Sequence, residues 1–528
     1  MPVHQCTGQI PINLISVLIP EGVLGTVGLM AKSLVVVLSD VHIGNGAPTV
    51  WYQPSVHEPY LVTALEWVVE HKDEVRELVL LGDMFDTWTY PPAVRPPSLA
   101  DIIAANPATL GADGALAKVV AALPGGVTLL LGNHDGTLTQ DDIAELSATV
   151  GPVSLVDPVH VLTGDSGART AFSHGHYWTM FNAPDERSPW NTLPVGHFVT
   201  RAFAFEMANK LQPGQTVADL PNMGAPNGFD LGQFLRSFRP TLDPSLARLL
   251  LDYVSNVAGL PQNLAIVLPD GSTTTIADAK RIYDDLFTRW VTKEGGNLVN
   301  AARAAFADQW GDYLAWFAQR LALQTGSDLV VMGHTHAAIG GLTVSPVNYI
   351  NSGFECPSKP DVPPKEFTFT LVDLEHASAE VFQVTKTGSG YGVSVFPAPR
   401  IPVVASPAMD FSCYVRIENR TGQPLARSRE VTQHGYWVVA PPQTIPPGGR
   451  GDIWLQDLPG AVGTEGGATY GSAGRNLEFK FSCPTGIWSN TVLGPNKNFI
   501  AKSGENDWQP RGQVPWFGHP LQVRFTVQ

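Results

Sequence analysis

Short apolar runs recur between residues 34 and 331, and polar residues follow each of them directly. The runs, which we expect to form strands, are 34–38, 78–81, 127–131, 171–172 and 328–331. Between the early runs, apolar residues recur at helical spacing over 60–75 and 98–122. Because alternating strands and helices favour parallel pairing through βαβ crossovers, the pattern predicts an α/β fold.

Asp, Asn and His residues stand at the end of all five runs. The groups are Asp40-Val41-His42, Gly82-Asp83-Met84-Phe85-Asp86, Gly132-Asn133-His134-Asp135, His174-Gly175-His176 and Gly333-His334-Thr335-His336. Any one of them alone is explained by a polar turn after a strand. Polar turns do not explain five such groups in succession. Open α/β sheets bind their ligands at the carboxyl ends of strands. We therefore predict one shared site.

In order, these groups read D-x-H, G-D-x-x-D, G-N-H-D, H-G and G-H-x-H. Over about residues 33–386 this set resembles the calcineurin-like metallophosphoesterase superfamily. The resemblance implies a four-layer α/β/β/α sandwich, formed here by 33–176 and 326–396, and a pair of metal ions. It assigns Asp40, His42, Asp83 and His336 to the first ion, and Asp83, Asn133, His174 and His334 to the second. Oxygen and imidazole donors without thiolate suit Mn, Zn or Fe better than Mg²⁺ or Ca²⁺.

The same resemblance implies hydrolysis of a phosphodiester, phosphomonoester or diphosphate through a metal-bridging hydroxide. It places His134 as general acid or transition-state stabiliser and Asp86 as the acceptor of the other imidazole N–H. Turn formation is the alternative for Asp86, and for Asp135 it is the interpretation that we favour. His176 competes with His174 as a ligand, because an H-G-H pair lets either ring reach the metal.

Residues 177–325 interrupt the motifs and carry helix-like apolar stripes. Asp243-Pro244 predicts one helix start, Thr275 with Asp278 predicts a second, and 301–323 reads as a long helix. We interpret this insertion as a helical cap over the metal site. Within it, His197 and Arg201 are candidates for binding a substrate phosphate, with a salt bridge inside the cap as the alternative.

A Pro-rich stretch at 397–408 predicts an extended linker. Beyond it, 409–528 shows short alternating segments separated by Gly and Pro, which predict a β-sandwich. This region loosely resembles the aegerolysin-like β-sandwiches, a resemblance that implies recognition of a lipid or membrane surface. Its five tryptophans are Trp437, Trp454, Trp488, Trp508 and Trp516. We expect most of them to be buried, with a lipid-facing patch as the alternative.

The chain has 528 residues and a formal net charge of −15, which argues against a general nucleic-acid binder. Residues 1–32 read as a leader of uncertain role, without a recognisable signal peptide or transmembrane helix. The four cysteines lack C-x-x-C spacing and predict a reduced, cytoplasmic protein, with peripheral membrane attachment as an open alternative. A Cys413–Cys483 disulfide is the alternative if the protein is exported.

The alternative to an enzyme is a lipid- or membrane-binding protein that uses a phosphoesterase fold as its scaffold. The pattern does not indicate an oligomeric state.

Overall fold

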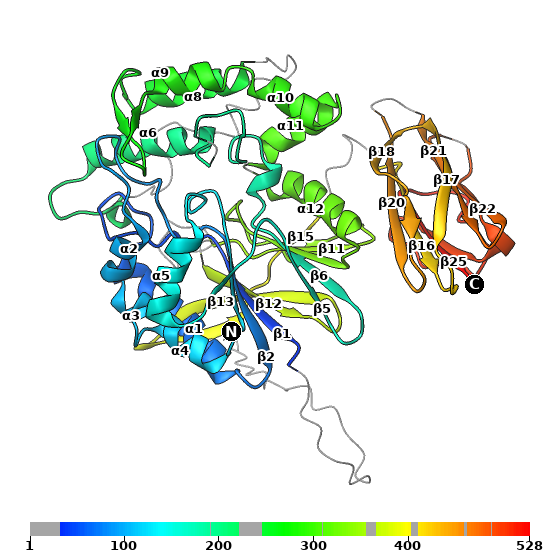
Figure 1. The fold of residues 1–528 in the computed structure, drawn as a ribbon, viewed down its shortest axis with the longest axis horizontal. Helices are drawn as coiled ribbons and strands as arrows, with labels where there is room; N and C mark the ends of the chain where they lie inside the picture. Colours follow the sequence, from blue (N-terminus) through cyan, green and yellow to red (C-terminus); the bar gives the residue numbers. More distant parts are fainter. Residues whose placement is uncertain are drawn as a thin grey trace, which may run out of the picture.

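The computed structural model describes residues 32–190, 192–220, 245–308, 310–354, 366–402, 410–458, 462–486 and 488–528. Their elements form a mixed α/β region followed by a strand-rich C-terminal region (Figure 1). The predicted leader lies almost wholly outside these ranges, as do Cys6, Cys356 and the helix start at Asp243-Pro244. The α/β prediction for the first region and the all-β prediction for the last are confirmed at this level.

A seven-stranded sheet forms the centre of the α/β region. In sheet order its strands are β14 (Gly390–Val395), β13 (Ser378–Thr387), β12 (Phe367–Asp373), β1 (Leu34–Leu38), β2 (Val75–Leu81), β3 (Val127–Leu130) and β4 (Ser154–Leu155). Strands β1 to β4 pair in parallel, whereas β12 to β14 pair antiparallel. The apolar runs of β1 and β3 fit strands that are buried on both faces.

A second sheet packs against the first. Its strands, in order, are β11 (Asn348–Asn351), β9 (Leu329–Met332), β6 (Arg169–Phe172) and β5 (His160–Thr163). Strands β6, β9 and β11 are parallel. One buried cluster joins side chains of the two sheets, among them Val35, Val79, Phe172, Val331 and Ile350. The carboxyl ends of the predicted strands are thereby brought to one region.

Helices cover the other face of the seven-stranded sheet. They are α1 (Pro54–Glu70), α2 (Leu99–Ala105), α3 (Pro107–Leu110), α4 (Ala115–Ala122) and α5 (Gln140–Val150). The predicted helix over 60–75 is shifted, since α1 begins at Pro54 and β2 already starts at Val75. The single helix predicted over 98–122 is wrong. It is broken before Pro107, which has no N–H to donate and restricts the residue before it.

The described residues between 177 and 325 are mainly helical, as predicted. The elements are η1 (His176–Trp178), α6 (Val195–Lys210), η2 (Val217–Asp219), α8 (Leu246–Val257), α9 (Ile276–Ile282), α10 (Leu286–Lys293), α11 (Leu298–Ala307) and α12 (Gly311–Thr325), with a small hairpin of β7 (Ile266–Val267) and β8 (Thr273–Thr274). Thr275 caps α9 by accepting from Asp278 N, as predicted. The long helix predicted over 301–323 is wrong, because Trp310 adopts an extended conformation between α11 and α12.

The C-terminal strands form two five-stranded sheets around a shared apolar core. One contains β18 (Tyr436–Val439), β20 (Arg450–Gln456), β16 (Cys413–Asn419), β25 (Leu521–Val527) and β24 (Phe499–Ser503). The other contains β19 (Thr444–Ile445), β17 (Leu425–His434), β21 (Gly463–Ser472), β22 (Arg475–Pro484) and β23 (Thr491–Leu493), and η3 (Pro495–Lys497) precedes β24. Cys413 and Cys483 are buried free thiols, so the disulfide alternative is not observed.

The C-terminal region packs directly on α12. The Trp316 ring lies 5.2 Å from the Trp454 ring, and Trp316 Nε1 donates to Gln456 Oε1 at 3.1 Å. Arg450 Nη1 forms a 2.8 Å ion pair with Asp328, the residue before β9. Within the predicted linker, β15 (Arg400–Ile401) pairs with β10 (Gly341–Leu342) rather than running free. The two regions are therefore joined through packed side chains as well as through the chain.

Three of the five C-terminal tryptophans are exposed, so the expectation that most are buried is wrong. The exposed fractions are 71% for Trp488, 38% for Trp508 and 72% for Trp516.

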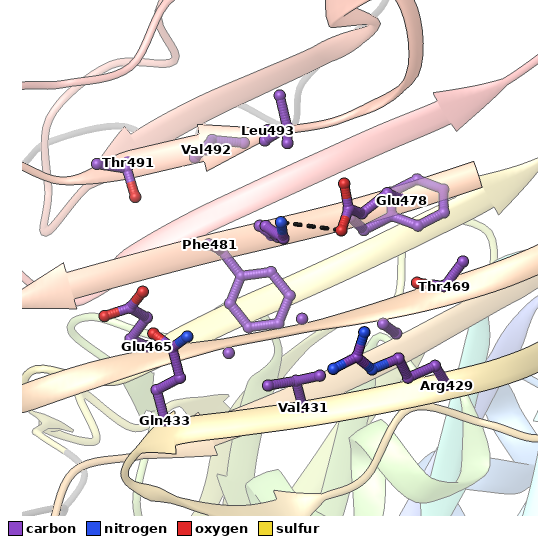
Figure 2. A pocket seen from close by; sticks show the side chains of 15 residues that line it. Arg429, Val431, Gln433, Glu465, Thr469, Glu478, Phe481, Thr491, Val492 and Leu493 are labelled. Carbon is purple, nitrogen blue, oxygen red and sulfur yellow. Dashed lines mark ion pairs between the residues drawn. The ribbon is translucent and has the colours of Figure 1, made fainter. Parts of the chain in front are cut away.

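A pocket of about 290 Å³ lies on the sheet of β17, β21, β22 and β23, with Phe481 and Val431 among its lining (Figure 2). It contains none of the predicted metal ligands. Among the described residues, no helix is both long and apolar enough to cross a membrane.

Candidate metal centre

The five polar groups lie at the carboxyl ends of β1, β2, β3, β6 and β9, where the sheets bring them together. Five of the residues have left-handed backbone conformations, which are rare for side chains other than Gly. They are Asp40, His42, Asp83, His334 and His336, with φ between 50° and 73°. Such strain, about 1–3 kcal/mol per residue, persists where the surroundings enforce it and clusters at functional sites.

Two glycines leave space for the carboxylates of this site. A Cβ on Gly132 would lie 2.2 Å from Asp83 Oδ1, and a Cβ on Gly333 would lie 2.5 Å from Asp40 Oδ2. Both contacts are far shorter than any allowed approach. Gly132 is therefore required because its loop packs closely against Asp83, and Gly333 is required because its loop packs closely against Asp40.

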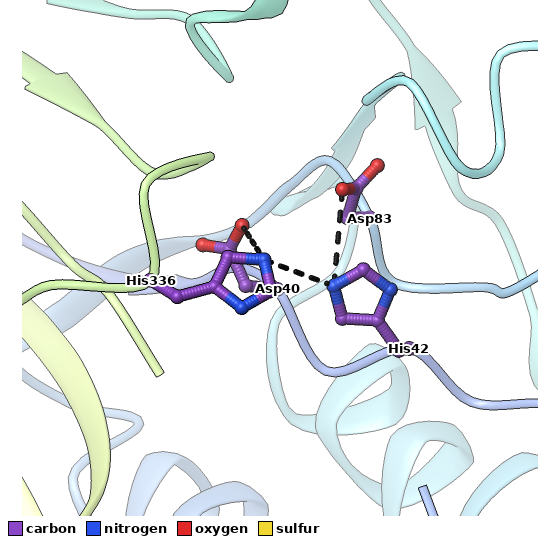
Figure 3. A group of neighbouring side chains, drawn as sticks. All are labelled: Asp40, His42, Asp83 and His336. Atoms are coloured by element: carbon purple, nitrogen blue, oxygen red, sulfur yellow. Dashed lines mark hydrogen bonds and ion pairs between the residues drawn. The ribbon is translucent and has the colours of Figure 1, made fainter. Parts of the chain in front are cut away.

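Asp40, His42, Asp83 and His336 converge on one point (Figure 3). Each offers a ligand atom, and these atoms lie within 4.8 Å of one another. His42 Nε2 lies 3.3 Å from His336 Nε2 and 3.8 Å from Asp83 Oδ2. Asp40 is held in place because its carboxylate accepts from Ser39 Oγ at 2.5 Å and from His334 N at 2.8 Å. These are the residues predicted for the first metal ion.

Asp83, His174 and His334 form a second cluster of the same dimensions. His174 Nε2 lies 3.4 Å from Asp83 Oδ2, and His334 Nδ1 lies 3.0 Å from Asn133 Oδ1. Asp83 is thus common to both clusters. Its Oδ1 accepts from His134 N at 2.7 Å, while Oδ2 faces a histidine of each cluster. The four residues predicted for the second ion lie together.

His134 is oriented by two neighbours. Its Nδ1 lies 3.2 Å from Asp86 Oδ1, and its ring stacks on Trp88 with centroids 4.3 Å apart. Asp86 in turn accepts from Trp88 N at 2.7 Å and from Thr89 Oγ1 at 2.7 Å. The predicted contact between His134 and Asp86 is present. The turn that we considered as the alternative role of Asp86 is also present, because its carboxylate accepts from Trp88 N. Asp86 therefore both forms the turn and orients His134.

Asp135 ties two of the loops together. Its carboxylate accepts from Met84 N at 2.9 Å and from Gly132 N at 2.6 Å, as expected of a residue that forms a turn. His176 is buried beside His174, with ring centroids 5.4 Å apart. It does not belong to either ligand cluster among the described residues, whereas His174 does.

The histidines of the site respond differently to their surroundings. Burial alone would lower the pKa of His174, but the Asp83 carboxylate, together with Asp40 and the Leu81 carbonyl oxygen, raises it to about 9. For His134, the Asp83 and Asp86 carboxylates likewise outweigh burial and raise its pKa. Burial and the neighbouring His134 lower the pKa of His42, so its ring is held neutral. The site therefore favours lone pairs on some rings and protons on others.

His197 and Arg201 lie outside the ligand clusters, on α6. His197 is fully buried, with its ring 5.5 Å from that of Trp88. Arg201 is also fully buried, and its Nη2 donates to the carbonyl oxygens of Pro91, Pro92 and Val94. These contacts give Arg201 a structural role in holding that loop, instead of the salt bridge considered as its alternative. Neither side chain reaches solvent, so substrate binding by them stays an untested prediction.

Several residues of the site carry no sequence motif. The Trp51 ring lies 4.8 Å from the His42 ring and 5.9 Å from the His336 ring. From the insertion, Thr179 Oγ1 lies 3.3 Å and Asp308 Oδ1 lies 3.7 Å from His334 Nε2. Burial raises the pKa of Asp308 to about 7, although hydrogen bonds to its carboxylate oppose the shift. None of these residues follows a predicted strand, so strand-end motifs do not reveal them.

The donor atoms fit a pair of metal ions. His174 Nδ1 lies 2.8 Å from the Leu81 carbonyl oxygen and donates to it, so Nε2, which faces Asp83, is the ring atom that a metal ion could bind in place of a proton. Within the described residues, this buried Nε2 atom has no hydrogen-bond partner. Carboxylate, amide and imidazole donors suit Mn, Zn or Fe.

No family model and no curated protein matches the chain. Among solved structures, a dimetal phosphatase from Danio rerio is similar at 13% identity and a TM-score of 0.26, over 69% of this chain and 99% of that one. The lipid binding protein Nakanori is similar at 14% identity and a TM-score of 0.18, over 22% of this chain and 69% of that one. Both TM-scores are low.

Proposed function

We propose that the protein is a dinuclear metal-dependent phosphoesterase that hydrolyses a phosphodiester, a phosphomonoester or a diphosphate. The observation that carries this proposal is the position of Asp83 in both ligand clusters. The layers of helices, sheet, second sheet and α12 support the four-layer interpretation, and we retain the predicted domain boundaries as part of the proposal.

When bound, two ions of Mn, Zn or Fe would neutralise charge on the phosphoryl oxygens and activate water. Asp40, His42, Asp83 and His336 would hold one ion, and Asp83, Asn133, His174 and His334 the other. The side chain of His336 is 19% exposed, in contrast to Asp40, Asp83 and His42, which are at most 1% exposed. A phosphate ester would therefore approach from the side of His336.

His134 would move the proton in the reaction. Because its Nδ1 donates to Asp86, its Nε2 is the atom left to face an ester oxygen. Stacking on Trp88 prevents the ring from turning away. This arrangement supports a role as general acid to the leaving group or as a donor to the phosphoryl oxygens.

Hydrolysis of model esters tests the proposal. Metal-depleted protein would be supplied with Mn²⁺, Zn²⁺ or Fe²⁺ in turn and assayed with p-nitrophenyl phosphate and bis(p-nitrophenyl) phosphate. We expect metal-dependent turnover that Asp83→Asn abolishes and that Asp73→Asn, a change at an exposed carboxylate, leaves intact. Absence of turnover with every metal and ester, together with an absence of bound metal, would contradict the proposal.

A second candidate function is docking on a lipid surface through the C-terminal region. Trp488, Trp516 and Phe517 are 71%, 72% and 58% exposed. Their two loops are joined, because Asn490 N donates to the Trp516 carbonyl oxygen at 3.0 Å. Exposed amphipathic indoles on adjacent loops suit the boundary between water and lipid headgroups.

Point variants test docking better than deletion of the region, which would strip the cover from Trp316 on α12. We expect Trp488→Ala with Trp516→Ala to reduce flotation with phosphatidylcholine–sphingomyelin vesicles. Leu298→Ala removes a comparably exposed apolar side chain from the insertion and should have no effect. Equal flotation of the double variant and the parent protein would remove this second function.

A further inference from the structure

Two residues of the insertion join His334 and Asn133, two candidate ligands of the second metal ion, in a closed ring of polar contacts. His334 Nδ1 lies 3.0 Å from Asn133 Oδ1, and Asn133 Nδ2 donates to Asn182 Oδ1 at 3.5 Å. Asn182 Nδ2 donates to Asp308 Oδ1 at 2.9 Å, and this oxygen lies 3.7 Å from His334 Nε2. Two candidate ligands from β3 and β9 thus alternate with two residues from 177–325.

Asp308 is firmly placed for this contact. Its side chain is only 1% exposed, and its other oxygen accepts from Phe181 N at 2.8 Å. The residue lies directly after α11, where the helix predicted over 301–323 is interrupted. The break between α11 and α12 therefore coincides with the point at which the insertion reaches the metal site.

The ring defines which atoms of the two ligands face inward. Asn182 Nδ2 donates to Asp308, which in its ionised form can only accept, so the Asn182 oxygen faces Asn133. Asn133 then uses its N–H outward and keeps Oδ1 for the site. By the same logic, the His334 proton belongs on Nε2, towards Asp308 and Thr179, and the lone pair belongs on Nδ1.

We propose that Asp308 and Asn182 are positioning residues that orient His334 and Asn133, so that the insertion determines how tightly the second metal ion is held. This inference rests on the proposed dinuclear site. It goes beyond the role of a cap that covers the substrate, because it makes residues 177–325 part of the metal-binding machinery. Within the described residues, the first cluster meets this ring through the His334 N–H, which donates to Asp40, and through Asp83, which shares the second cluster with His334, so we expect it to be affected little.

Metal titration tests this inference without relying on catalysis. Calorimetric titration of metal-depleted protein with Mn²⁺, followed by electron paramagnetic resonance, would report the number of ions and the coupling between them. For the parent protein we expect two ions and a coupled signal. For Asp308→Ala and Asn182→Ala we expect one ion to bind about 10–100-fold more weakly, with the signal of an isolated Mn²⁺ at intermediate concentrations.

Asp284→Asn is the matched control. This carboxylate also lies in the insertion, but it is 54% exposed and pairs with Arg248, which is not a member of the ring. Asp308→Asn keeps the side-chain shape and carries the same expectation if the alanine variant fails to fold. Two ions bound with unchanged affinity in folded Asp308 and Asn182 variants would overturn the inference while leaving the proposed function intact. No metal bound by the parent protein would overturn both.

Discussion

The Nδ1 atom of His134 lies 3.2 Å from Asp86 Oδ1, although the two residues follow different strands. The contact is possible because β2 and β3 are parallel neighbours, so the loops after them leave the sheet at the same edge. Asp86 is fixed by the backbone of Trp88 and Thr89, and Trp88 covers the His134 ring. One short loop therefore sets both the tautomer and the plane of the imidazole.

His134→Ala should lower turnover by roughly two to four powers of ten, the usual contribution of an acid–base group. The two clusters that share Asp83 should retain metal, because His134 belongs to neither; it belongs to a third group, with His42 and Asp86, which lacks the shared carboxylate. Steady-state kinetics together with metal analysis by mass spectrometry would measure both effects. Asp86→Asn should have a smaller effect, about 10–100-fold, since it acts through the orientation of His134. Unchanged turnover in His134→Ala would rule out its assigned role.

A methyl group at Gly132 or Gly333 should disable the metal site. The new Cβ would lie 2.2 Å from Asp83 Oδ1 or 2.5 Å from Asp40 Oδ2, so the carboxylate must move. We expect Gly132→Ala and Gly333→Ala to bind less metal than the parent protein. Gly422→Ala is the control, because a Cβ there meets nothing within 4 Å. Full metal occupancy in both Gly132→Ala and Gly333→Ala would contradict this prediction, because it would mean that the loops around these glycines can shift without displacing the carboxylates.

Trp316→Ala should destabilise the fold by about 3–5 kcal/mol, the usual cost of removing a buried large aromatic residue. Trp316 is fully buried between α12 and the C-terminal sheet, and it also donates to Gln456. Urea unfolding followed by circular dichroism would measure the loss. Trp516→Ala, at a residue 72% exposed, should change stability by less than about 0.5 kcal/mol. Similar midpoints for both variants would mean that the two regions are not coupled.

Asp457→Asn should stabilise the protein at neutral pH. Burial, with the charge of Asp410, raises the pKa of Asp457 to about 6 from its ordinary value of 3.8. The folded state therefore binds this proton more tightly than the unfolded state, and the ionised form destabilises the fold above pH 6. As the pH falls from about 6 to 4, the parent protein should recover this free energy, roughly 1–3 kcal/mol.

The variant should thus show a higher midpoint of urea unfolding at pH 7.5, and the difference should vanish near pH 4. The exposed Asp73→Asn provides the comparison, because its side chain is 88% exposed. A constant difference between parent and Asp457→Asn across this pH range would argue against ionisation of Asp457 as its cause.

Strand-end motifs were predictable from sequence because their geometry is local. Once an apolar run forms a strand, the residues after it must lie at one edge of the sheet, which is how Asp40, Asp83 and Asn133 come together. Helix boundaries were predicted less well. The helices predicted over 98–122 and 301–323 run past the breaks at Pro107 and Trp310, because apolar residues continue on both sides of each break.

Contacts between distant segments were not predictable. Asp308 and Asn182 reach His334 and Asn133 only because α11 ends beside the loop after η1, a tertiary arrangement without a sequence signal. The same holds for Trp316, whose burial depends on a sheet that begins about a hundred residues later. Hydrophobicity marks such a residue as apolar, but it does not identify the surface that covers it.

Anomalous diffraction from crystals grown with Mn²⁺ or Zn²⁺ tests the central claim most directly. We expect two anomalous peaks, one on each side of Asp83: the first bounded by His42 and His336, and the second by His174 and His334. Crystals with no peak at Asp83, or with a single ion that leaves one cluster empty at saturating metal, would contradict a dinuclear centre.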